Sequence, residues 1–273
     1  MPGQTAQGVI QMSLVPLYIG ESISDEIAMT TLAKGRYVAR TAETDADLQA
    51  AQALRKQAFL GQDVAGLDAD SYDPLCTHFL VEDQTDGRLV CCFRILPLAG
   101  GGEIGRSYSA QFYELSALEG FDGPMVEMGR FCIHPDVQDP DILRVAWGAM
   151  TAYVDENNVE MLFGCSSFSG TDAAEYFDAF AVLRDKHIAP KRWLPKVKAP
   201  NVFRFAARLR RKPDPKRAQM RMPPLLRTYL LMGGWVSDHA VVDRQMNTLH
   251  VFTGLEIRAI PPARKRLLRA IAV

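Results

Sequence analysis

The segment M-V-E-M-G-R-F-C-I-H-P, residues 125–135, decides the architecture that this sequence predicts. Its apolar residues suit a largely buried strand, although Glu127 and Arg130 place two charges inside it. Shortly after it, Asp139 supplies an N-cap and Pro140 a proline at the first helical position. The apolar face of the expected helix consists of Ile142, Val145, Ala146, Ala149 and Tyr153.

Upstream of this segment, the pattern predicts a strand, a helix and a hairpin. Residues 37–39 are strand-like, and Thr44 to Asp47 form a capping box before a helix that runs to Phe59. Residues 78–82 and 89–96 flank Asp86-Gly87, which is a strong signal for an antiparallel hairpin. Residues 108–118 look helical, and a Gly-rich loop at 100–102 precedes them.

Downstream, residues 159–164 read as a short apolar strand, and Thr171 caps a helix that ends near Arg184. A further helix begins at Pro223-Pro224 and ends at Gly233-Gly234, and residues 235–242 and 248–257 read as two strands. This order predicts an α/β fold with a mixed central sheet flanked by helices, rather than a doubly wound Rossmann domain. The sequence contains no Gly-rich dinucleotide or P-loop fingerprint.

The chain has 273 residues, of which 48% are hydrophobic and 9% aromatic, so it can bury a substantial core. We expect a variable N-terminal arm over residues 1–34, one domain over 35–260 with a basic insertion at 184–227, and a basic amphipathic tail over 261–273.

The cysteines and histidines indicate neither disulfides nor a metal. The five cysteines are odd in number and lack C-x-x-C spacing, so we interpret them as buried thiols in a reducing cytosol. The five histidines lack metal-ligand spacing, so we predict no metal. No basic leader and no apolar run of about 20 residues is present, and we therefore expect a cytoplasmic protein that does not span a membrane.

The net charge of −1 hides a strong asymmetry between two parts of the chain. Residues 1–183 carry 10 Lys/Arg against 27 Asp/Glu, a balance of −17, whereas residues 184–273 carry 21 against 5, a balance of +16. Such a basic part suits an anionic partner, which is a nucleic acid, an anionic membrane or an acidic protein. The simpler alternative is a solvated basic face that neutralises the acidic part.

Four groups of residues carry polar chemistry that a core does not require. They are Arg55 with Phe59, the acidic run from Asp68 to Asp73, Arg94 within an apolar strand, and the segment Glu127 to Phe131. Burying Arg94 is costly unless a carboxylate meets it, and Asp70 or Asp73 would be that carboxylate.

In this order, the motifs R-x-x-x-F, D-x-D-x-Y-D, R-I-L-P and E-x-x-R-F resemble those of acyl-homoserine-lactone synthases. The chain is more similar to the related ornithine-acyl-carrier-protein N-acyltransferases, which share V-E-M-G-R-F-x-I-H-P. Two C-terminal motifs of that family are also recognisable, at residues 223–236 and 243–248. The resemblance covers residues 36–257 and implies the GNAT acyltransferase fold.

The resemblance implies a fatty acyl donor that is held where strand 125–133 splays from its neighbour. GNAT enzymes usually bind the pyrophosphate of coenzyme A at the next helix N-terminus through a Gly-rich turn. Here that turn is Val137 to Asp141, with carboxylates and no glycine. We therefore expect acyl carrier protein as donor, carrying the chain on its phosphopantetheine, and no separate cofactor.

The resemblance also implies roles for the polar groups. Glu127 is expected to be the catalytic base that deprotonates the amine, and the alternative is a structural ion pair with Arg130. Arg55, Arg94 or Arg130 would bind the amino acid's carboxylate, and Asp70 or Asp73 a side-chain ammonium. A purely structural network among these acids and arginines explains them equally well.

The remaining candidates are weaker. We place Phe59, Phe131 and Ser167 in the substrate site; Ser166 and Ser167 would stabilise the leaving thiolate or satisfy loop backbone. His134 is expected to be structural rather than a proton relay. Asp243, Asn247 and Thr248 match a family motif, and a turn between strands explains Asp and Asn equally well.

Two basic segments suit the partners that such a reaction needs. The segment Arg184–Arg227 has 15 Lys/Arg and two acids, which favours docking of acidic acyl carrier protein. The expected contact residues are Arg204, Arg208, Arg210, Arg211 and Lys212. The tail suits peripheral contact with the inner face of an anionic membrane, and simple solubilisation is its alternative.

The expected reaction moves a (3-hydroxy)fatty acyl chain to the α-amine of ornithine and gives lyso-ornithine lipid. Its rivals are the same transfer to glutamine or lysine, acyl-homoserine-lactone synthesis, and nucleic-acid binding by residues 184–227, for which no reading motif is present. The mechanism requires Glu127 to face a cavity beside a splayed strand.

Overall fold

The computed structural model describes residues 32–61 and 65–270, which fold around a ten-stranded mixed sheet. The strand order is β1-β2-β3-β4-β6-β7-β12-β11-β9, with β10 also pairing with β12. All of these ladders are antiparallel except β6 with β7. The strands of this sheet are β1 (Leu32–Lys34), β2 (Tyr37–Thr41), β3 (Thr77–Asp83), β4 (Arg88–Leu98), β6 (Met125–Ile133), β7 (Met161–Ser169), β9 (Val202–Phe203), β10 (Trp235–Val236), β11 (Ala240–Asp243) and β12 (Thr248–Glu256). A separate ladder joins β5 (Tyr113–Glu114) to β8 (Lys196–Val197).

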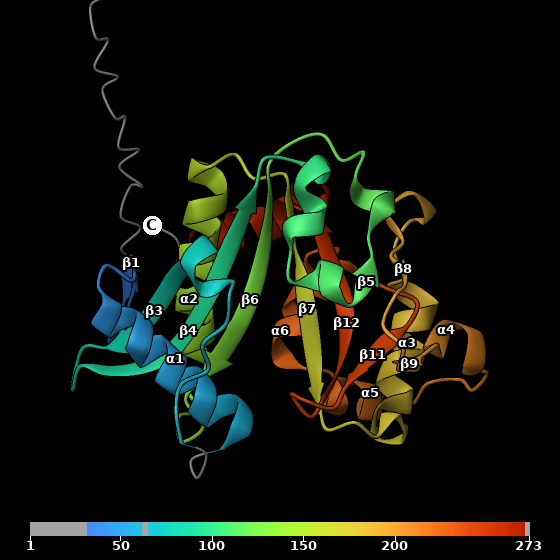
Figure 1. Ribbon diagram of the computed structural model, residues 1–273, viewed down its shortest axis with the longest axis horizontal. Coiled ribbons are helices and arrows are strands. Elements are labelled where there is room, and N and C mark those ends of the chain that lie inside the picture. The colour runs from blue at the N-terminus through green and yellow to red at the C-terminus, as the bar shows by residue number, and fades with distance from the viewer. Residues whose placement is uncertain (1–31, 62–64, 271–273) are drawn as a thin grey trace, which may run out of the picture.

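Helices cover both faces of the sheet (Figure 1). They are α1 (Asp45–Leu60), α2 (Pro140–Glu156), α3 (Phe177–Lys186), α4 (Phe205–Arg208), α5 (Pro215–Arg221), α6 (Pro224–Leu231) and α7 (Pro262–Arg269). One face packs on α2, α3 and α6 through the larger apolar clusters. The opposite face carries α1 and the irregular segment 99–121, which hold two further clusters. The predicted mixed sheet between helices is confirmed.

Two predicted helix starts, those of α1 and α2, are confirmed by their caps, whereas Asp172 rather than the predicted Thr171 caps the turn before α3. Thr44 accepts a hydrogen bond from the amide of Asp47, whose carboxylate bonds the Thr44 amide in return. Asp139 caps the amide of Asp141, with Pro140 at the first helical position of α2. The hairpin expected around Asp86-Gly87 is also present, because β3 pairs with β4 and Gly87 takes a φ of 72°.

The helix predicted over residues 108–118 is wrong. The segment consists of short 3-10 turns, η2 (Gly101–Arg106), η3 (Ser109–Gln111) and η4 (Ser116–Leu118), together with β5. The amides of Tyr108 and Ser109 bond the carboxylate of Glu127 instead of continuing a helix. A side chain distant in sequence therefore takes the donors that a first helical turn would leave unpaired.

The strand predicted over residues 235–242 is two strands, β10 and β11, separated by residues 237–239. The Ser237 hydroxyl donates to the carbonyl of His239 and accepts from the amide of Phe252, so a side chain interrupts the ladder. Two other boundaries also differ: the strand expected at 159–164 runs to Ser169, and the helix expected from 171 begins as the turn η5 (Ala173–Tyr176) before α3.

The two central strands, β6 and β7, form a fork. They pair only at Met125–Met161, Val126–Leu162 and Glu127–Phe163, and they then diverge toward their C-terminal ends (Figure 1). Gly164 lies at the point of divergence, where an added Cβ would come within 2.3 Å of the Met128 carbonyl oxygen. The bulge opposite Phe93, where Arg130 has a φ of 53°, bends β6 at the same level.

The structure describes most of the C-terminal tail but little of the expected N-terminal arm. Residues 1–31 and 271–273 lie outside the described residues, as do 62–64. Most of the expected N-terminal arm is therefore undescribed. In the tail, α7 packs on α2: Leu268 contacts the main core, Arg269 pairs with Asp155 at 2.8 Å, and Leu267 is exposed. Within residues 32–61 and 65–270, none of the helices has the length and apolar character that crossing a bilayer requires.

Candidate active site

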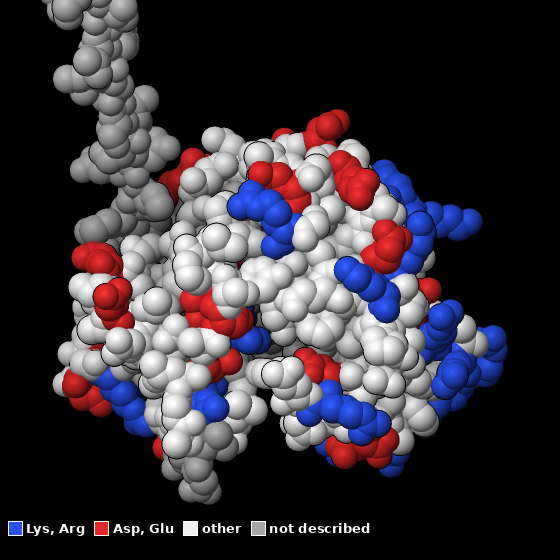
Figure 2. Space-filling model, in the orientation of Figure 1, with Lys and Arg blue, Asp and Glu red and all other residues white. Residues whose placement is uncertain are grey.

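A cavity of about 390 Å³ opens at the fork, where the surface is hollowed between the two halves of the sheet (Figure 2). Its walls come from α1, β4, β6, β7, α6 and the β11–β12 hairpin. The predicted site residues that line it are Phe59, Arg94, Glu127, Arg130, Phe131 and Ser167. Segments from residue 58 to residue 250 therefore meet at one place.

Strand register explains why so many polar side chains gather there. Side chains on one strand alternate between faces, and directly paired residues share a face. Glu127 pairs with Phe163, so Cys165 and Ser167 lie on the same face as Glu127. Ser167 pairs with His250, and Thr248 pairs with Asp243. A row of polar side chains thus crosses the α1 face of the sheet.

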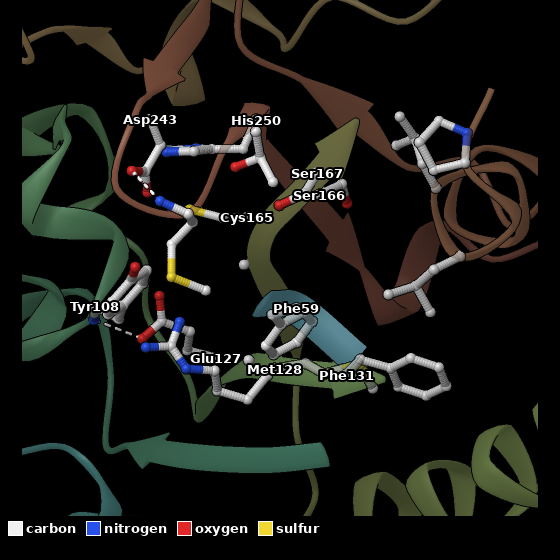
Figure 3. A pocket seen from close by; sticks show the side chains of 18 of the residues that line it. Phe59, Tyr108, Glu127, Met128, Phe131, Cys165, Ser166, Ser167, Asp243 and His250 are labelled. Carbon is white, nitrogen blue, oxygen red and sulfur yellow. Dashed lines mark hydrogen bonds between the residues drawn. The ribbon is translucent and has the colours of Figure 1, made fainter. Parts of the chain in front are cut away.

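Glu127 is held firmly at the closed end of the fork. One carboxylate oxygen accepts from the Tyr108 amide at 2.7 Å (Figure 3). The other accepts from the Ser109 amide at 2.8 Å and from the Ser109 hydroxyl at 2.5 Å. The residue is 4% exposed and borders the cavity. Burial raises the pKa of Glu127 above its ordinary value, although the Ser109 and Tyr108 donors oppose that shift. A carboxylate with a raised pKa beside a cavity suits the role of a proton acceptor.

The alternative in which Glu127 serves as the ion-pair partner of Arg130 is wrong. The Arg130 guanidinium instead donates to Asp70 at 3.0 Å and lies 3.0 Å from the Asp68 carboxylate. It also lies over the Tyr108 ring, 5.3 Å from the ring centroid. Its positive φ directs the side chain toward this acidic group, while the residue still lines the cavity.

Three arginines and three aspartates form a network beneath the cavity. Arg55 donates to Asp73 at 2.8 Å and to Asp68 at 2.8 Å. Arg94 donates to Asp70 at 2.6 and 2.8 Å and also to Asp73, which confirms that carboxylates meet the buried arginine. Burial opposes ionisation of Asp73, but the Arg55 guanidinium outweighs it and holds the pKa of Asp73 well below its usual range. The network is therefore a set of fixed opposite charges.

This geometry separates the predicted substrate contacts into two groups. Arg94 and Arg130 border the cavity, whereas Arg55, Asp70 and Asp73 are absent from its lining. Arg55 is 1% exposed and Asp73 is 4% exposed, and both have their partners within the protein. Arg55 and Asp73 therefore fit the alternative of a purely structural network, in which they position the arginines that face the cavity.

The other wall of the cavity is apolar and comes largely from α6. Pro223, Pro224, Leu225, Leu226 and Tyr229 line it, opposite Phe59 and Phe131. On β7, Ser167 is exposed to the cavity, whereas the buried Ser166 hydroxyl accepts from Thr253 at 2.9 Å. Such a wall suits an acyl chain beside a polar reaction centre.

Sequence reasoning missed several residues of the site. Ser109 and Tyr108 hold Glu127, and neither was assigned a role from the sequence. Asp68 completes the network, and it was noted only as part of the acidic run. His250, 3% exposed, also borders the cavity. Its position two residues after Thr248 on an alternating strand was the available signal.

Other predicted residues lie away from the cavity. His134 bonds Arg88 at 3.0 Å and is absent from the lining, in line with the structural role expected for it. Arg204, Arg208, Arg210, Arg211 and Lys212 are exposed around α4, on the side where basic side chains gather in Figure 2. Arg211 pairs with Asp178 at 2.9 Å. The five described cysteines are free; Cys91, Cys92 and Cys132 are buried as expected, whereas Cys76 and Cys165 are half-buried.

Comparison with known proteins gives consistent matches. The acetyltransferase (GNAT) domain family matches residues 53–148. An L-ornithine N(alpha)-acyltransferase of Rhodobacter capsulatus is 32% identical in an alignment 239 positions long that covers 82% of this chain and 91% of the relative. A protein of the same name from Rhizobium meliloti is 28% identical in an alignment 238 positions long that covers 81% of this chain and 80% of the relative. A solved N-acyl amino acid synthase from uncultured soil microbes, 14% identical, covers 82% of this chain and 94% of that one with a TM-score of 0.49.

The sequence match covers 82% of this chain and 91% of the relative. The mixed sheet, the forked central strands and the domain match together identify a GNAT-like acyltransferase fold. The family resemblance seen in the sequence is thereby confirmed: this chain is an acyltransferase and belongs to the L-ornithine N(alpha)-acyltransferase family.

Proposed function

We propose that this enzyme transfers a (3-hydroxy)fatty acyl chain from acyl carrier protein to the α-amine of ornithine, giving lyso-ornithine lipid. The observation that carries this proposal is the buried Glu127 carboxylate at the closed end of a fork that opens into a partly apolar cavity. The names of the curated relatives support ornithine as the acceptor.

In this mechanism, the acyl thioester lies in the fork and the amine approaches Glu127. Beyond Glu127 and Phe163, the strand ladder no longer pairs β6 with β7, so backbone groups of both strands face the opening. Their amides suit the oxyanion that forms on the thioester carbonyl. As the amine nitrogen bonds to the thioester carbon, Glu127 takes the amine proton, directly or through one water. The C–S bond then breaks, and the same proton passes from Glu127 to the leaving thiolate.

Ser109 and Tyr108 give that base a single orientation, because three donors fix both carboxylate oxygens. Arg94 and Arg130 border the same cavity and carry the charge that the carboxylate of an amino acid requires. Their aspartate partners keep the guanidinium groups in place before substrate arrives.

The N-terminus of α2 supports a carrier-protein donor. Asp139 already accepts the Asp141 amide at 2.9 Å, and the Tyr37 hydroxyl donates to the same carboxylate at 2.9 Å. A pyrophosphate would meet this carboxylate at the place where GNAT enzymes usually offer free amides. The single phosphodiester of a carrier protein meets less repulsion, and the exposed arginines around α4 suit its acidic surface.

Peripheral contact with the inner face of the cytoplasmic membrane is part of the same proposal. The product carries a fatty chain, and α7 exposes Arg264, Arg266 and Leu267 on the surface, with Lys265 half-buried beside them. Because Arg269 and Leu268 attach the helix to α2, the basic side is presented outward.

The test incubates the enzyme with 3-hydroxyacyl-carrier protein and each of the twenty amino acids plus ornithine, followed by mass spectrometry of the lipids. N-acylated ornithine is the expected product. Glutamine or lysine as the preferred acceptor would change the head group but keep the mechanism. Transfer from acyl-coenzyme A at the same efficiency would contradict the donor assignment.

A further inference from the structure

We infer that Asp243, with His250 beside it, binds the side-chain ammonium of the acceptor amino acid. This inference rests on the proposed function and moves the ammonium contact away from Asp70 and Asp73, where the sequence had placed it. Those two aspartates are absent from the cavity lining and are paired with arginines. Among the described residues, Glu127 and Asp243 are the two carboxylates that line the cavity.

The two carboxylates that line the cavity differ in how many of their oxygens already accept hydrogen bonds. Glu127 accepts three hydrogen bonds from the 108–109 turn. Asp243 accepts the amides of Gln245 and Met246 with one oxygen, both at 3.0 Å. For its second oxygen, no hydrogen bond or ion pair forms within the described part of the chain. Asp243 is thus a half-buried carboxylate on the cavity wall that has no cationic partner among the described residues.

His250 offers a second, independent acceptor. The Tyr113 hydroxyl has one proton, which it donates to the backbone carbonyl of His250 at 2.8 Å. The same hydroxyl lies 3.1 Å from Nδ1, so that nitrogen carries the ring proton and donates to the Tyr113 oxygen. We therefore assign the lone pair to Nε2, which is buried and has no partner among the described residues. Burial lowers the pKa of His250 to about 4, which keeps the ring neutral at physiological pH.

Strand geometry brings the two acceptors together. Asp243 pairs with Thr248 and His250 with Val241, so Asp243 and His250 are diagonal neighbours on one face of the β11–β12 hairpin. Diagonal Cα atoms in such a pair lie roughly 7–8 Å apart, within reach of both side chains. Figure 3 shows Asp243 and His250 at one end of the cavity and Glu127 with Tyr108 at the other, with Cys165 between them.

The chemistry of this end selects a cationic N–H donor. A carboxylate oxygen and a neutral imidazole lone pair both accept, and an ammonium offers three donors and a positive charge. Glu127 at the other end takes the proton of the reacting α-amine. A diamino acid can therefore bridge the cavity, with one nitrogen at each end.

The test compares ornithine with norvaline, which has the same carbon skeleton without the side-chain amine. Ratios of kcat/KM for the two acceptors are measured with saturating acyl-carrier protein for the wild type, Asp243→Asn and His250→Asn. Asparagine at 243 keeps an oxygen for the two turn amides, and at 250 it keeps a donor for Tyr113. The control is Asp86→Asn, because Asp86 accepts one turn amide at 3.0 Å in a distant hairpin.

We expect Asp243→Asn to lower the ornithine/norvaline ratio roughly 10- to 100-fold, mainly through a higher KM for ornithine. His250→Asn lowers the ratio less, and Asp86→Asn leaves it unchanged. A ratio retained in both site variants, or a wild type that does not distinguish the two acceptors, overturns the inference. A wild type that acylates no amino acid overturns the proposed function itself, so the two failures are distinguishable.

Discussion

At the residue scale, Glu127, the proposed base, has an environment that is built by two neighbours in space rather than in sequence. Its burial among apolar side chains raises the pKa, and the Ser109 hydroxyl at 2.5 Å limits the rise. The balance between these two effects decides at which pH the carboxylate is ionised and therefore active.

Replacing Glu127 by Gln removes the proton acceptor while keeping the shape of the side chain. We expect kcat/KM for acyl transfer to fall by about 10²- to 10⁴-fold, which is the usual contribution of a general base. Lipid product formation, measured by mass spectrometry at fixed acyl-carrier protein, checks this result. Transfer at the wild-type rate would show that Glu127 is not the base.

Ser109→Ala tests the pKa argument by its sign. The hydroxyl stabilises the ionised carboxylate, so its removal raises the pKa of Glu127 further. Because the base must be deprotonated to act, activity falls as pH drops through that pKa. The acid limb of the kcat/KM profile should therefore move to higher pH in Ser109→Ala than in the wild type. A limb that stays in place or moves to lower pH contradicts the assignment.

Asp73→Asn should destabilise the fold rather than alter substrate binding directly. The carboxylate meets Arg55 and Arg94, which are 1% and 3% exposed, and its loss leaves buried charge uncompensated. The expected loss is about 3–5 kcal/mol in the free energy of unfolding, measured by urea titration. Asp86→Asn on the exposed hairpin turn is the control and should lie within about 0.5 kcal/mol of wild type.

The same variant predicts a pH dependence. The folded-state pKa of Asp73 is depressed, so its stabilisation is present above the unfolded value of about 4 and is lost as pH falls further. Wild-type stability should therefore decrease on acidification below about pH 4, and the decrease should be shallower in Asp73→Asn. Parallel pH profiles for the two proteins would contradict the ion-pair argument.

At the element scale, the fork depends on how closely β7 approaches β6. Gly164 allows this approach, because a Cβ there would lie 2.3 Å from the Met128 carbonyl oxygen. Gly164→Ala should cost about 1–3 kcal/mol in unfolding free energy and reduce transfer, since the strands must shift at the reaction centre. Gly102→Ala is the matched control, because no heavy atom lies within 4 Å of its added Cβ. Equal stability and activity of the two variants would show that the fork tolerates displacement.

The helices and strands also show which features of the fold can be predicted from sequence patterns. Capping boxes and turn residues are local signals, so the starts of α1 and α2 and the β3–β4 hairpin followed from the residues alone. The order of motifs also gave Glu127 and the two cavity-facing arginines. Contacts between residues that are distant in sequence could not be predicted from local patterns. Hydrogen bonds from the 108–109 turn to Glu127, for example, replace the helix expected there. Likewise, Asp243 was a motif residue with no evident role until the hairpin placed it on the cavity wall.

At the scale of the whole molecule, the two basic surfaces should serve two different partners. Arg204, Arg208 and Lys212 are exposed around α4, whereas Arg264, Lys265 and Arg266 belong to α7. We expect Arg204→Glu, Arg208→Glu and Lys212→Glu together to raise the KM for acyl-carrier protein about 10-fold at low salt, with kcat retained. The KM difference from wild type should shrink as ionic strength increases.

The triple Glu variant of Arg264, Lys265 and Arg266 is the reciprocal control with the same change in charge. It should lose flotation with anionic vesicles and keep the wild-type KM for acyl-carrier protein. Loss of vesicle binding in the α4 variant, or a raised KM in the α7 variant, would show that the surfaces have been assigned to the wrong partners.

The fork between β6 and β7 would fix only one end of a bound acyl chain. The thioester would lie where the strands are still paired, beside Glu127, and the methylenes would extend outward between the diverging strands. Adding carbons to the chain would therefore not disturb the reacting atoms. The acceptor amino acid, in contrast, would have to fit between Glu127 at one end of the cavity and Asp243 with His250 at the other. Selectivity should consequently be strict for the amino acid and graded for the length of the fatty chain.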